Sequence, residues 1–398
     1  MNIAVAQSGG PTAAINSSLC GVFDEAEKYN EIDRIYGSLN GIEGILNDNL
    51  IDLKEVLITE NDKQLLKRTP STVLGSCRFK LKNSSDDDSD YKRITQTFAK
   101  YDIKAFFYIG GNDSMDTVMK LDAYFRENHI DIKVVGVPKT IDNDLPLTDH
   151  TPGFGSAAKY VATTLQEIIR DSRVYSIPSV TIVEIMGRDA GWLTASSCVL
   201  RANGEPAPHL IYLPESDFSE ERYLEDVKRI SERYKAVIVA VSEGIDCLAS
   251  RSEATDAFGH KYLSGVGKYL EELTRDHIGC KVRSIELNVM QRCGSHIASL
   301  TDLDEAWRIG AAAVNEALKY GGVMMGFRRI SNNPYRVGIA PLDVRECANK
   351  AKYFPKEWIT PEGNNVTIDA LNYFLPLIQG EPKIDYRNGI PVHFRLDQ

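Results

Sequence analysis

The sequence lacks the features of a membrane or secreted protein. No apolar run reaches the roughly 18–20 residues that a transmembrane helix needs, and the mean hydropathy is -0.26. No basic segment precedes the first apolar run, so we expect no signal peptide. Positive charge is also scarce, because 46 Lys and Arg face 56 Asp and Glu. Nucleic-acid partners usually require a basic face, so we expect a cytoplasmic protein that binds neither membranes nor nucleic acids.

Cysteine is sparse and irregularly spaced. The seven cysteines are scattered along 398 residues and form no CxxC pair, which argues against a disulfide framework or a structural zinc site. Hydrophobic residues make up 43% of the chain and charged residues 26%, so a disordered or fibrous protein is excluded. The length suits about two or three domains, or one large two-lobed unit.

Short Val- and Ile-rich runs recur along the chain, at 3–6, 105–109, 134–137, 180–185, 236–241 and 337–340. Runs of this kind are typical of parallel strands that are buried on both faces. Helix-like patterns lie between them, at 13–29, 115–128, 155–172 and 303–319. This alternation predicts an α/β protein with doubly wound parallel sheets, in which ligands bind beyond the carboxyl ends of the strands.

Two glycine-rich segments follow predicted strands and precede predicted helices. The first, at 7–12, reads QSGGPT, and the second, at 110–114, reads GGNDS. Glycine lets the backbone approach an anion and a helix N-terminus supplies amide donors, so both segments are candidate phosphate sites. Neither has the spacing of a dinucleotide loop or of a P-loop. A tight turn at 7–12 and a simple helix cap at 112–114 remain the alternatives.

The segment PKTIDND at 138–144 is the most informative one. It follows the predicted strand at 134–137, so it should lie at the same sheet edge as the two glycine-rich loops. One of its carboxylates, Asp142 or Asp144, can accept a proton while the other orients the substrate. Lys139 is a point charge suited to a phosphate oxygen. Phosphoryl transfer to an alcohol needs such groups, although DND alone also suits an Asx-rich turn.

Further residues could complete a site for a phosphorylated sugar. Arg78 and the segment 186–188 offer cations and close backbone contact, and Glu243 ends a predicted strand where an acidic group suits sugar hydroxyls. Arg283 and Arg292 could each bind a phosphate through two parallel hydrogen bonds. Taken singly, each arginine is more often a surface or ion-pair residue.

Together these segments resemble the phosphofructokinase family, and they follow one another in the family's order. The matching blocks, between residues 7 and 292, are QSGGPTAAIN, GSCRF, GGNDSMD, PKTIDND, EIMGRDAGW, SEG and VRSIELNVMQR. The resemblance implies two Rossmann-like doubly wound lobes with the active site in the cleft between them. Residues 1–155 with 291–345 would form the phosphoryl-donor lobe, and 156–290 with 346–398 the sugar-phosphate lobe.

The resemblance also implies a role for each candidate residue. Asp142 would be the general base that takes the proton from the C1 hydroxyl of fructose 6-phosphate. The residues that would hold the phosphoryl donor are Gly10, Arg78 and Ser114. Those that would surround the sugar phosphate are Thr140, Asp144, Met186, Gly187, Arg188, Glu243, Arg283 and Arg292. Because Arg283 would come from a neighbouring subunit, we expect a homodimer or homotetramer.

Two positions indicate the donor. ATP-using relatives carry glycine where this chain has Asp113 and Lys139. A carboxylate at 113 would repel and obstruct the α-phosphate of ATP, whereas Lys139 could stabilise the charge on the leaving group when pyrophosphate is the donor. The pair resembles the pyrophosphate-dependent branch, so we expect Mg²⁺-dependent, reversible formation of fructose 1,6-bisphosphate and phosphate in glycolysis. An ATP-dependent enzyme and a non-catalytic, sugar-phosphate-binding regulatory subunit remain the alternatives.

The sequence departs from the family pattern at three positions. Many relatives carry aspartate at the position of Asn112, where it helps to hold Mg²⁺, so direct ligation of the metal by Asn112 is open. Ser179 and Val289 stand where ATP-using relatives often carry Arg and His for the sugar phosphate. A related acceptor such as sedoheptulose 7-phosphate could therefore also be used. The family's allosteric nucleotide site cannot be traced, so we predict a non-allosteric enzyme.

Overall fold

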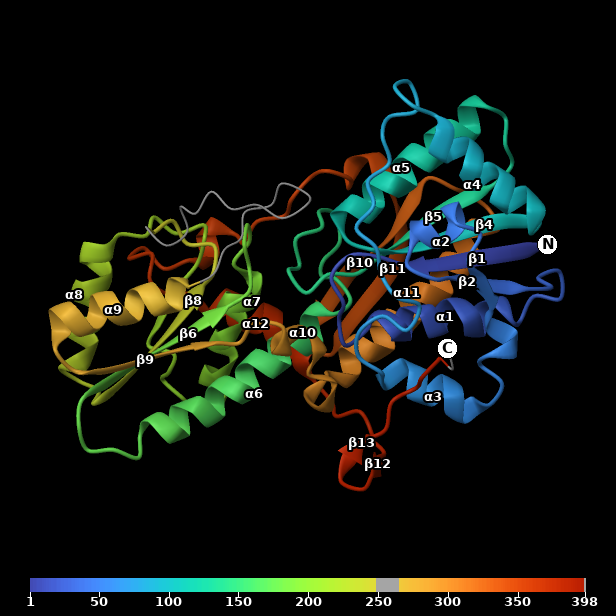
Figure 1. Ribbon diagram of the computed structural model, residues 1–398. Helices are drawn as coiled ribbons and strands as arrows, with labels where there is room; N and C mark the ends of the chain where they lie inside the picture. Colours follow the sequence, from blue (N-terminus) through green and yellow to red (C-terminus); the bar gives the residue numbers. More distant parts are fainter. Residues whose placement is uncertain (248–264, 397–398) are drawn as a thin grey trace.

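The computed structural model describes residues 1–247 and 265–396. Two lobes lie side by side, each built around its own sheet (Figure 1). The larger sheet has the strand order β11-β10-β5-β4-β1-β2-β3, and the smaller one has the order β7-β8-β6-β9. The predicted α/β class and the two doubly wound lobes are confirmed.

The first lobe contains the seven-stranded sheet. Its strands are β1 (Asn2–Gln7), β2 (Ile35–Ser38), β3 (Leu50–Asp52), β4 (Ile103–Gly110), β5 (Lys133–Pro138), β10 (Val323–Asn332) and β11 (Tyr335–Asp343). Its helices are α1 (Ile15–Ala26), α2 (Ile42–Leu46), α3 (Glu60–Arg68), α4 (Ser89–Lys100), α5 (Asn112–Glu127) and α11 (Leu300–Ala317). The five inner strands run parallel, and the edge strands β3 and β11 run antiparallel to their neighbours.

Helices cover both faces of this sheet, and the alternation of side chains along β1 shows how. Ile3 and Val5 join a buried cluster with side chains of α1 and α11. Ala4 and Ala6 point the other way, into a cluster with side chains of α2, α4 and α5. Because both faces are buried, the inner strands carry continuous apolar runs, which is why they could be predicted from the sequence.

The second lobe contains the four-stranded parallel sheet. Its strands are β6 (Ser179–Ile185), β7 (Leu210–Tyr212), β8 (Ala236–Ser242) and β9 (Lys281–Glu286). Its helices are α6 (Phe154–Ser172), α7 (Trp192–Ala195), α8 (Glu220–Ser231), α9 (Val266–Ile278), α10 (Met290–Cys293) and α12 (Ile368–Phe374). Side chains of α6, α7 and α12 pack on one face of the sheet, and those of α8 and α9 pack on the other.

The C-terminal part of the chain contacts both lobes. Phe354, Val366 and Phe374 belong to the core of the second lobe. The chain then forms a small ribbon of β12 (Tyr386–Arg387) and β13 (Ile390–Pro391) and returns to the first lobe, where Phe394 N donates to Thr69 Oγ1 at 2.8 Å. The domain boundaries given above stay a prediction.

For one predicted strand, the run at 337–340, the expected parallel pairing is wrong. The run at 337–340 is expected to be a buried parallel strand, but it lies in β11, an antiparallel edge strand that is mostly half-buried or exposed. The inner parallel strand in this region is β10, which pairs with β5 through Val323 and Met324. A hairpin turn joins β10 to β11. Of these two strands, only β10 lies inside the sheet, and β11 forms its edge.

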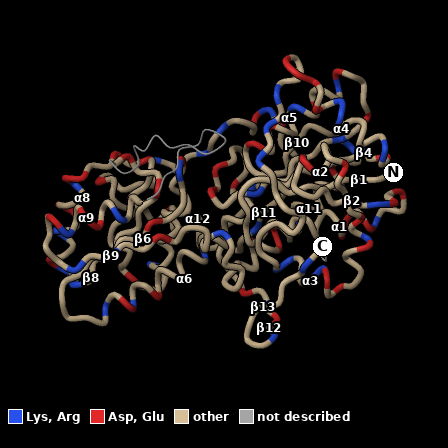
Figure 2. Tube along the Cα trace, viewed as in Figure 1, with Lys and Arg blue, Asp and Glu red and all other residues tan. Residues whose placement is uncertain are grey.

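The charged residues do not form a single basic face. Lys and Arg alternate with Asp and Glu over both lobes (Figure 2), as expected for a chain with a net charge of -10. No helix in the described ranges combines the length and the apolar character that crossing a membrane would require.

Candidate active site

A cavity of about 580 Å³ lies between the lobes. One wall consists of the loops that follow β1, β4 and β5, and the other consists of loops that follow β6 and β8. Except for Gly187 and Arg283, every predicted site residue lines this cavity: Gly10, Arg78, Asn112, Asp113, Ser114, Lys139, Thr140, Asp142, Asp144, Met186, Arg188, Glu243 and Arg292. The carboxyl ends of parallel strands meet at one edge, so segments far apart in the sequence share one site.

The loops after β1 and β4 are built for close backbone approach. Gly9 has a φ of 76°, in the region that favours glycine. A Cβ on Gly110 would lie 1.9 Å from Ser114 Oγ, so no side chain fits at this position. Asp113 stands exposed in the first turn of α5. The amide groups of this helix N-terminus form one end of the cavity, where an anionic ligand is favoured.

Two cations lie against the β1 loop. The Lys139 side chain is 2% exposed, and its Nζ donates to the Gly10 carbonyl at 2.6 Å. A Cβ on Gly10 would lie 3.3 Å from Arg292 Nη1. The pKa of Lys139 is lowered to about 8, chiefly by burial and in smaller part by Arg292, while Asp142 opposes both effects. The ammonium therefore remains charged at neutral pH in a place that a phosphate can reach.

The loop after β5 presents two carboxylates to the cavity. Asn143 has a φ of 54° and is fully buried, so Asp142 and Asp144 on either side of it both line the cavity. Thr140 Oγ1 accepts from Asp142 N at 3.0 Å and donates to Asp142 Oδ2 at 3.4 Å. Asparagine adopts this left-handed conformation more readily than most residues, which explains why DND suits this turn.

The electrostatics of the cavity favour proton transfer near neutral pH. The pKa of Asp142 is raised to about 6, chiefly by burial and then by the neighbouring Glu243 carboxylate, while Lys139 and Arg188 oppose the rise. Burial and the Asp142 charge raise the pKa of Asp144 to about 7. Burial also raises the pKa of Glu243 to about 7. Such perturbed carboxylates in a cleft are typical of acid–base sites.

The second lobe contributes Met186, Arg188 and Glu243 to the opposite wall. Gly187 lies next to the cavity and its N–H donates to Glu243 Oε1 at 3.4 Å. A Cβ on Gly244 would lie 1.8 Å from the Arg188 carbonyl, which explains the glycine after Glu243. Within the described part of the chain, Arg188 Nε is buried and has no hydrogen-bond partner. An unpartnered buried guanidinium N–H suits an anionic or hydroxyl-bearing ligand.

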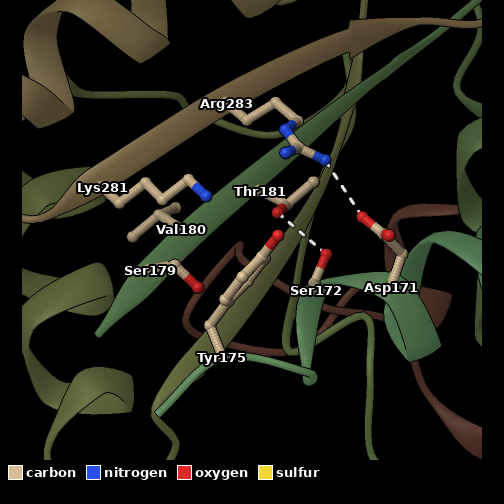
Figure 3. A pocket seen from close by; sticks show the side chains of 8 residues that line it. All are labelled: Asp171, Ser172, Tyr175, Ser179, Val180, Thr181, Lys281 and Arg283. Carbon is tan, nitrogen blue, oxygen red and sulfur yellow. Dashed lines mark hydrogen bonds and ion pairs between the residues drawn. The ribbon is translucent and has the colours of Figure 1, made fainter. Parts of the chain in front are cut away.

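Arg283 does not enter this cavity. It lies on β9 in a separate hollow with Asp171, Tyr175, Thr181 and Lys281 (Figure 3). Its Nη1 pairs with Asp171 Oδ2 at 3.1 Å, and the side chain is about half exposed. Any role for Arg283 in a sugar-phosphate site therefore requires the site of another copy of the chain.

The motif analysis missed one wall of the cavity. Asn349, Lys350, Ala351 and Tyr353 line it, although this segment lies beyond every recognised block. Asn112 binds the segment with both ends of its amide: Nδ2 donates to the Lys350 carbonyl at 2.6 Å, and Oδ1 accepts from Asn349 N at 2.5 Å. Direct ligation of a metal by Asn112 stays a prediction, for which one lone pair of Oδ1 is left. Residues 349–353 include no glycine and no acidic residue, so no motif in the sequence indicates that they line the cavity.

A cleft between two doubly wound lobes, lined by glycine loops, cations and paired carboxylates, defines a phosphoryl-transfer enzyme of the two-lobed type. The sequence profile of the family described as "Phosphofructokinase" matches residues 2–317. The chain therefore belongs to the phosphofructokinase family.

Three relatives illustrate the similarity. "Pyrophosphate--fructose 6-phosphate 1-phosphotransferase" of Halomonas elongata is 37% identical over 99% of this chain and 96% of its own length. "Sulfofructose kinase" of Alkalicoccus urumqiensis is 32% identical over 86% of this chain and 88% of its own. The crystal structure of pyrophosphate-dependent phosphofructokinase from Marinobacter aquaeolei superposes with a TM-score of 0.88 at 38% identity, covering 100% of this chain and 96% of that one.

Proposed function

We propose that the protein transfers a phosphoryl group from pyrophosphate to the C1 hydroxyl of fructose 6-phosphate, giving fructose 1,6-bisphosphate and phosphate. The observation that carries the proposal is the meeting of Asp113, Lys139 and Asp142 in one cavity between the lobes. The named activity of the Halomonas relative supports the same reaction. The bonds broken and formed are of similar energy, so the transfer is readily reversible, as suits a cytoplasmic glycolytic enzyme without allosteric control.

The residues divide the chemistry between them. Asp142 accepts the hydroxyl proton at a carboxylate oxygen as the alcohol attacks, and Thr140 holds that carboxylate in place. Lys139 stabilises the charge that develops on the leaving phosphate. Gly10, Arg78 and Ser114 bind the donor, and no residue is required to carry the phosphoryl group covalently. Catalysis therefore rests on positioning and charge neutralisation.

The sugar phosphate occupies the wall that the second lobe contributes. Thr140 and Asp144 surround the reacting hydroxyl, and Met186, Gly187, Arg188 and Glu243 line the sugar. Arg292 and Arg283 of a neighbouring subunit bind the 6-phosphate. This arrangement makes the active form a homodimer or a homotetramer. A related acceptor such as sedoheptulose 7-phosphate can enter if the positions of Ser179 and Val289 leave more room than in ATP-using relatives.

The donor end of the cavity suits an Mg²⁺ ion that takes few of its ligands from the protein. In the described residues no cluster of three or more His, Cys, Asp and Glu could hold a metal. Mg²⁺ in phosphoryl-transfer sites is usually held by one or two carboxylates together with substrate phosphates and water. Asn112, through its remaining lone pair, would hold the ion together with pyrophosphate and water. The bound ion supplies neutralisation of the phosphate charge.

A coupled assay of both directions tests the reaction. Purified protein is incubated with fructose 6-phosphate, Mg²⁺ and either pyrophosphate or ATP, and fructose 1,6-bisphosphate is measured. We expect turnover with pyrophosphate and none with ATP, and formation of pyrophosphate when the products are supplied. Turnover with ATP alone would identify the ATP-dependent alternative, and binding of sugar phosphate without turnover would identify the regulatory subunit.

Removal of the metal is expected to abolish turnover. Excess EDTA withdraws the divalent ion that neutralises pyrophosphate, and added Mg²⁺ should restore the rate. Pyrophosphate consumption measured before and after dialysis against the chelator checks this. The same rate in metal-free buffer would contradict the proposed requirement for the ion and, with it, the assignment of Asn112 as a ligand.

The pH profile should be bell-shaped. Asp142, with its pKa raised to about 6 by burial, must be ionised to accept a proton, so kcat/KM should fall by about tenfold per pH unit below its pKa. Lys139, with its pKa lowered to about 8 by burial, must be protonated, so kcat/KM should fall again above that value. Initial rates between pH 5 and 9.5 measure both limbs, and Lys139→Met should remove the alkaline one. A flat profile across this range would contradict both assignments.

Arg283→Ala should raise KM for fructose 6-phosphate by about 10- to 100-fold, because a charge-assisted hydrogen bond contributes roughly 1.5–3 kcal/mol. Mixing Arg283→Ala with Asp142→Asn subunits then tests the shared site. A mixed dimer would contain one site with both native residues, so activity at low substrate should exceed the sum of the separate variants. No recovery in a demonstrated mixed oligomer would assign Arg283 to its ion pair with Asp171 instead.

A further inference from the structure

A lysine behind the catalytic loop is absent from every recognised motif. Lys352 follows the cavity wall at 349–351 and lies beyond residue 317, where the match to the family profile ends. Part of the residue reaches the surface, but its ammonium is enclosed by protein. A buried ammonium is costly unless hydrogen bonds satisfy it, so its contacts indicate what it does.

All three hydrogen-bond donors of the Lys352 ammonium go to the segment that follows Asp142. Nζ donates to Asn143 Oδ1 at 3.2 Å, to the Thr148 carbonyl at 3.1 Å and to the Asp149 carbonyl at 3.0 Å. An ammonium has three protons, so its capacity is fully used. These bonds hold Asn143 and the loop after it in place. Asn143 is the residue in the left-handed conformation, and Asp142 and Asp144 on either side of it line the cavity.

The backbone of Lys352 extends the same linkage across the two lobes. Lys352 N donates to the Asp144 carbonyl at 2.7 Å, and the Lys352 carbonyl accepts from Trp192 Nε1 at 3.0 Å. The ammonium also lies over the Trp192 ring, 4.9 Å from its centroid. Trp192 belongs to the core of the second lobe. One residue therefore ties the catalytic loop to the lobe that faces it.

The charges around Lys352 connect it with the acid–base chemistry. Burial lowers the pKa of Lys352 to about 7, although Asp149 and Asp144 favour its protonated form; Arg329 on β10 acts in the same direction as burial. Arg329 itself pairs with Asp149 at 2.9 Å, and Asp149 also binds His150. Tyr373 on α12 completes the surroundings by donating to the Asp149 carbonyl. The positive charge of Lys352 in turn lowers the pKa of Asp144, opposing the burial and the Asp142 charge that raise it.

We infer that Lys352 is a positioning residue of the phosphoryl transfer, which holds the 142–149 loop so that Asp142 and Asp144 face the substrate. The inference rests on the proposed function, because it takes Asp142 as the base. Lys352 touches no substrate, so it acts through the loop. Its removal should therefore affect the chemical step more than donor binding.

Lys352→Met removes the charge and the donors at nearly constant length. We expect kcat to fall by about 10- to 10²-fold, since small misplacements of a reacting group cost up to this much. KM for pyrophosphate should stay within about threefold, because the donor loops are untouched. Lys352→Arg keeps the charge and should recover part of the rate.

The control is Lys356→Met, since Lys356 is an exposed lysine on η6 (Lys356–Trp358) outside the cavity. Its kinetics should equal those of the unaltered protein, and thermal melting should show that all variants fold. If Lys352→Met does not fold, Lys352→Gln, which retains two amide donors, takes its place in the same assays. A folded variant with unchanged kcat would overturn the inference, as would equal losses of kcat in Lys352→Met and Lys352→Arg, or a rise in KM for pyrophosphate as large as the fall in kcat. The unaltered protein is assayed with pyrophosphate and with ATP in parallel, so failure of the donor assignment is seen separately.

Discussion

Replacing Asp142 with asparagine is expected to lower kcat by roughly 10²- to 10⁴-fold, the contribution typical of a general base. Asparagine has almost the same shape, so the hydrogen bonds with Thr140 and the left-handed turn at Asn143 can persist. It cannot accept the hydroxyl proton as the carboxylate does. Binding of fructose 6-phosphate, measured by calorimetry, should therefore remain while the rate collapses.

Asp131→Asn is the matched control for Asp142→Asn, because Asp131 makes an exposed ion pair with Lys133 outside the cavity. Asp131→Asn should leave kcat and the binding of fructose 6-phosphate unchanged. The acid limb offers an independent readout, since the limb assigned to Asp142 should disappear from the residual activity of Asp142→Asn. A variant with at least a tenth of the original kcat, or one that retains the limb, would assign the proton to another group, with Asp144 and Glu243 as the remaining carboxylates of the cavity.

The sequence predicts the part of the site that lies in loops at the carboxyl ends of parallel strands. The loops after β1, β4 and β5 follow buried apolar runs, and the carboxyl ends of parallel strands meet at one edge. The proximity of Gly10, Asp113 and Asp142 follows from these two facts without any knowledge of distances. The inner strands could be located for the same reason, because burial on both faces makes them continuously apolar.

Contacts over long sequence distances could not be predicted in this way. Asn112 binds the backbone of 349–350, more than 230 residues away, and Lys352 reaches the loop at 143–149. Neither contact leaves a local pattern, because a lysine in a loop or an asparagine at a helix N-terminus can bind many other partners, solvent included. The orientation of Arg283 was equally inaccessible, since a strand on the edge of its sheet can face either a ligand or a second subunit.

The proposed choice of donor depends on the charge at one position in the first turn of α5, so Asp113→Gly should admit ATP. The N-terminus of this helix would otherwise favour an anion, and the carboxylate replaces that attraction with repulsion. A like charge at about 4 Å costs between about 1 and 4 kcal/mol, depending on solvent screening. We therefore expect kcat/KM for ATP to rise by roughly 10- to 10³-fold, whereas kcat/KM for pyrophosphate should fall.

The double variant, Asp113→Gly with Lys139→Gly, separates the effects of these two residues on the choice of donor. Lys139 lies against the β1 loop and is proposed to stabilise the leaving phosphate of pyrophosphate, so adding Lys139→Gly should further reduce the use of pyrophosphate but affect the use of ATP less. Asp90→Gly makes the same change in the first turn of α4, away from the cavity, and controls for the loss of helix stability. If Asp113→Gly folds and gains neither affinity for ATP nor turnover with it, the carboxylate does not exclude the nucleotide. The wall at 349–353, which closes the same end of the cavity and is bound by Asn112, would then be the structure that does.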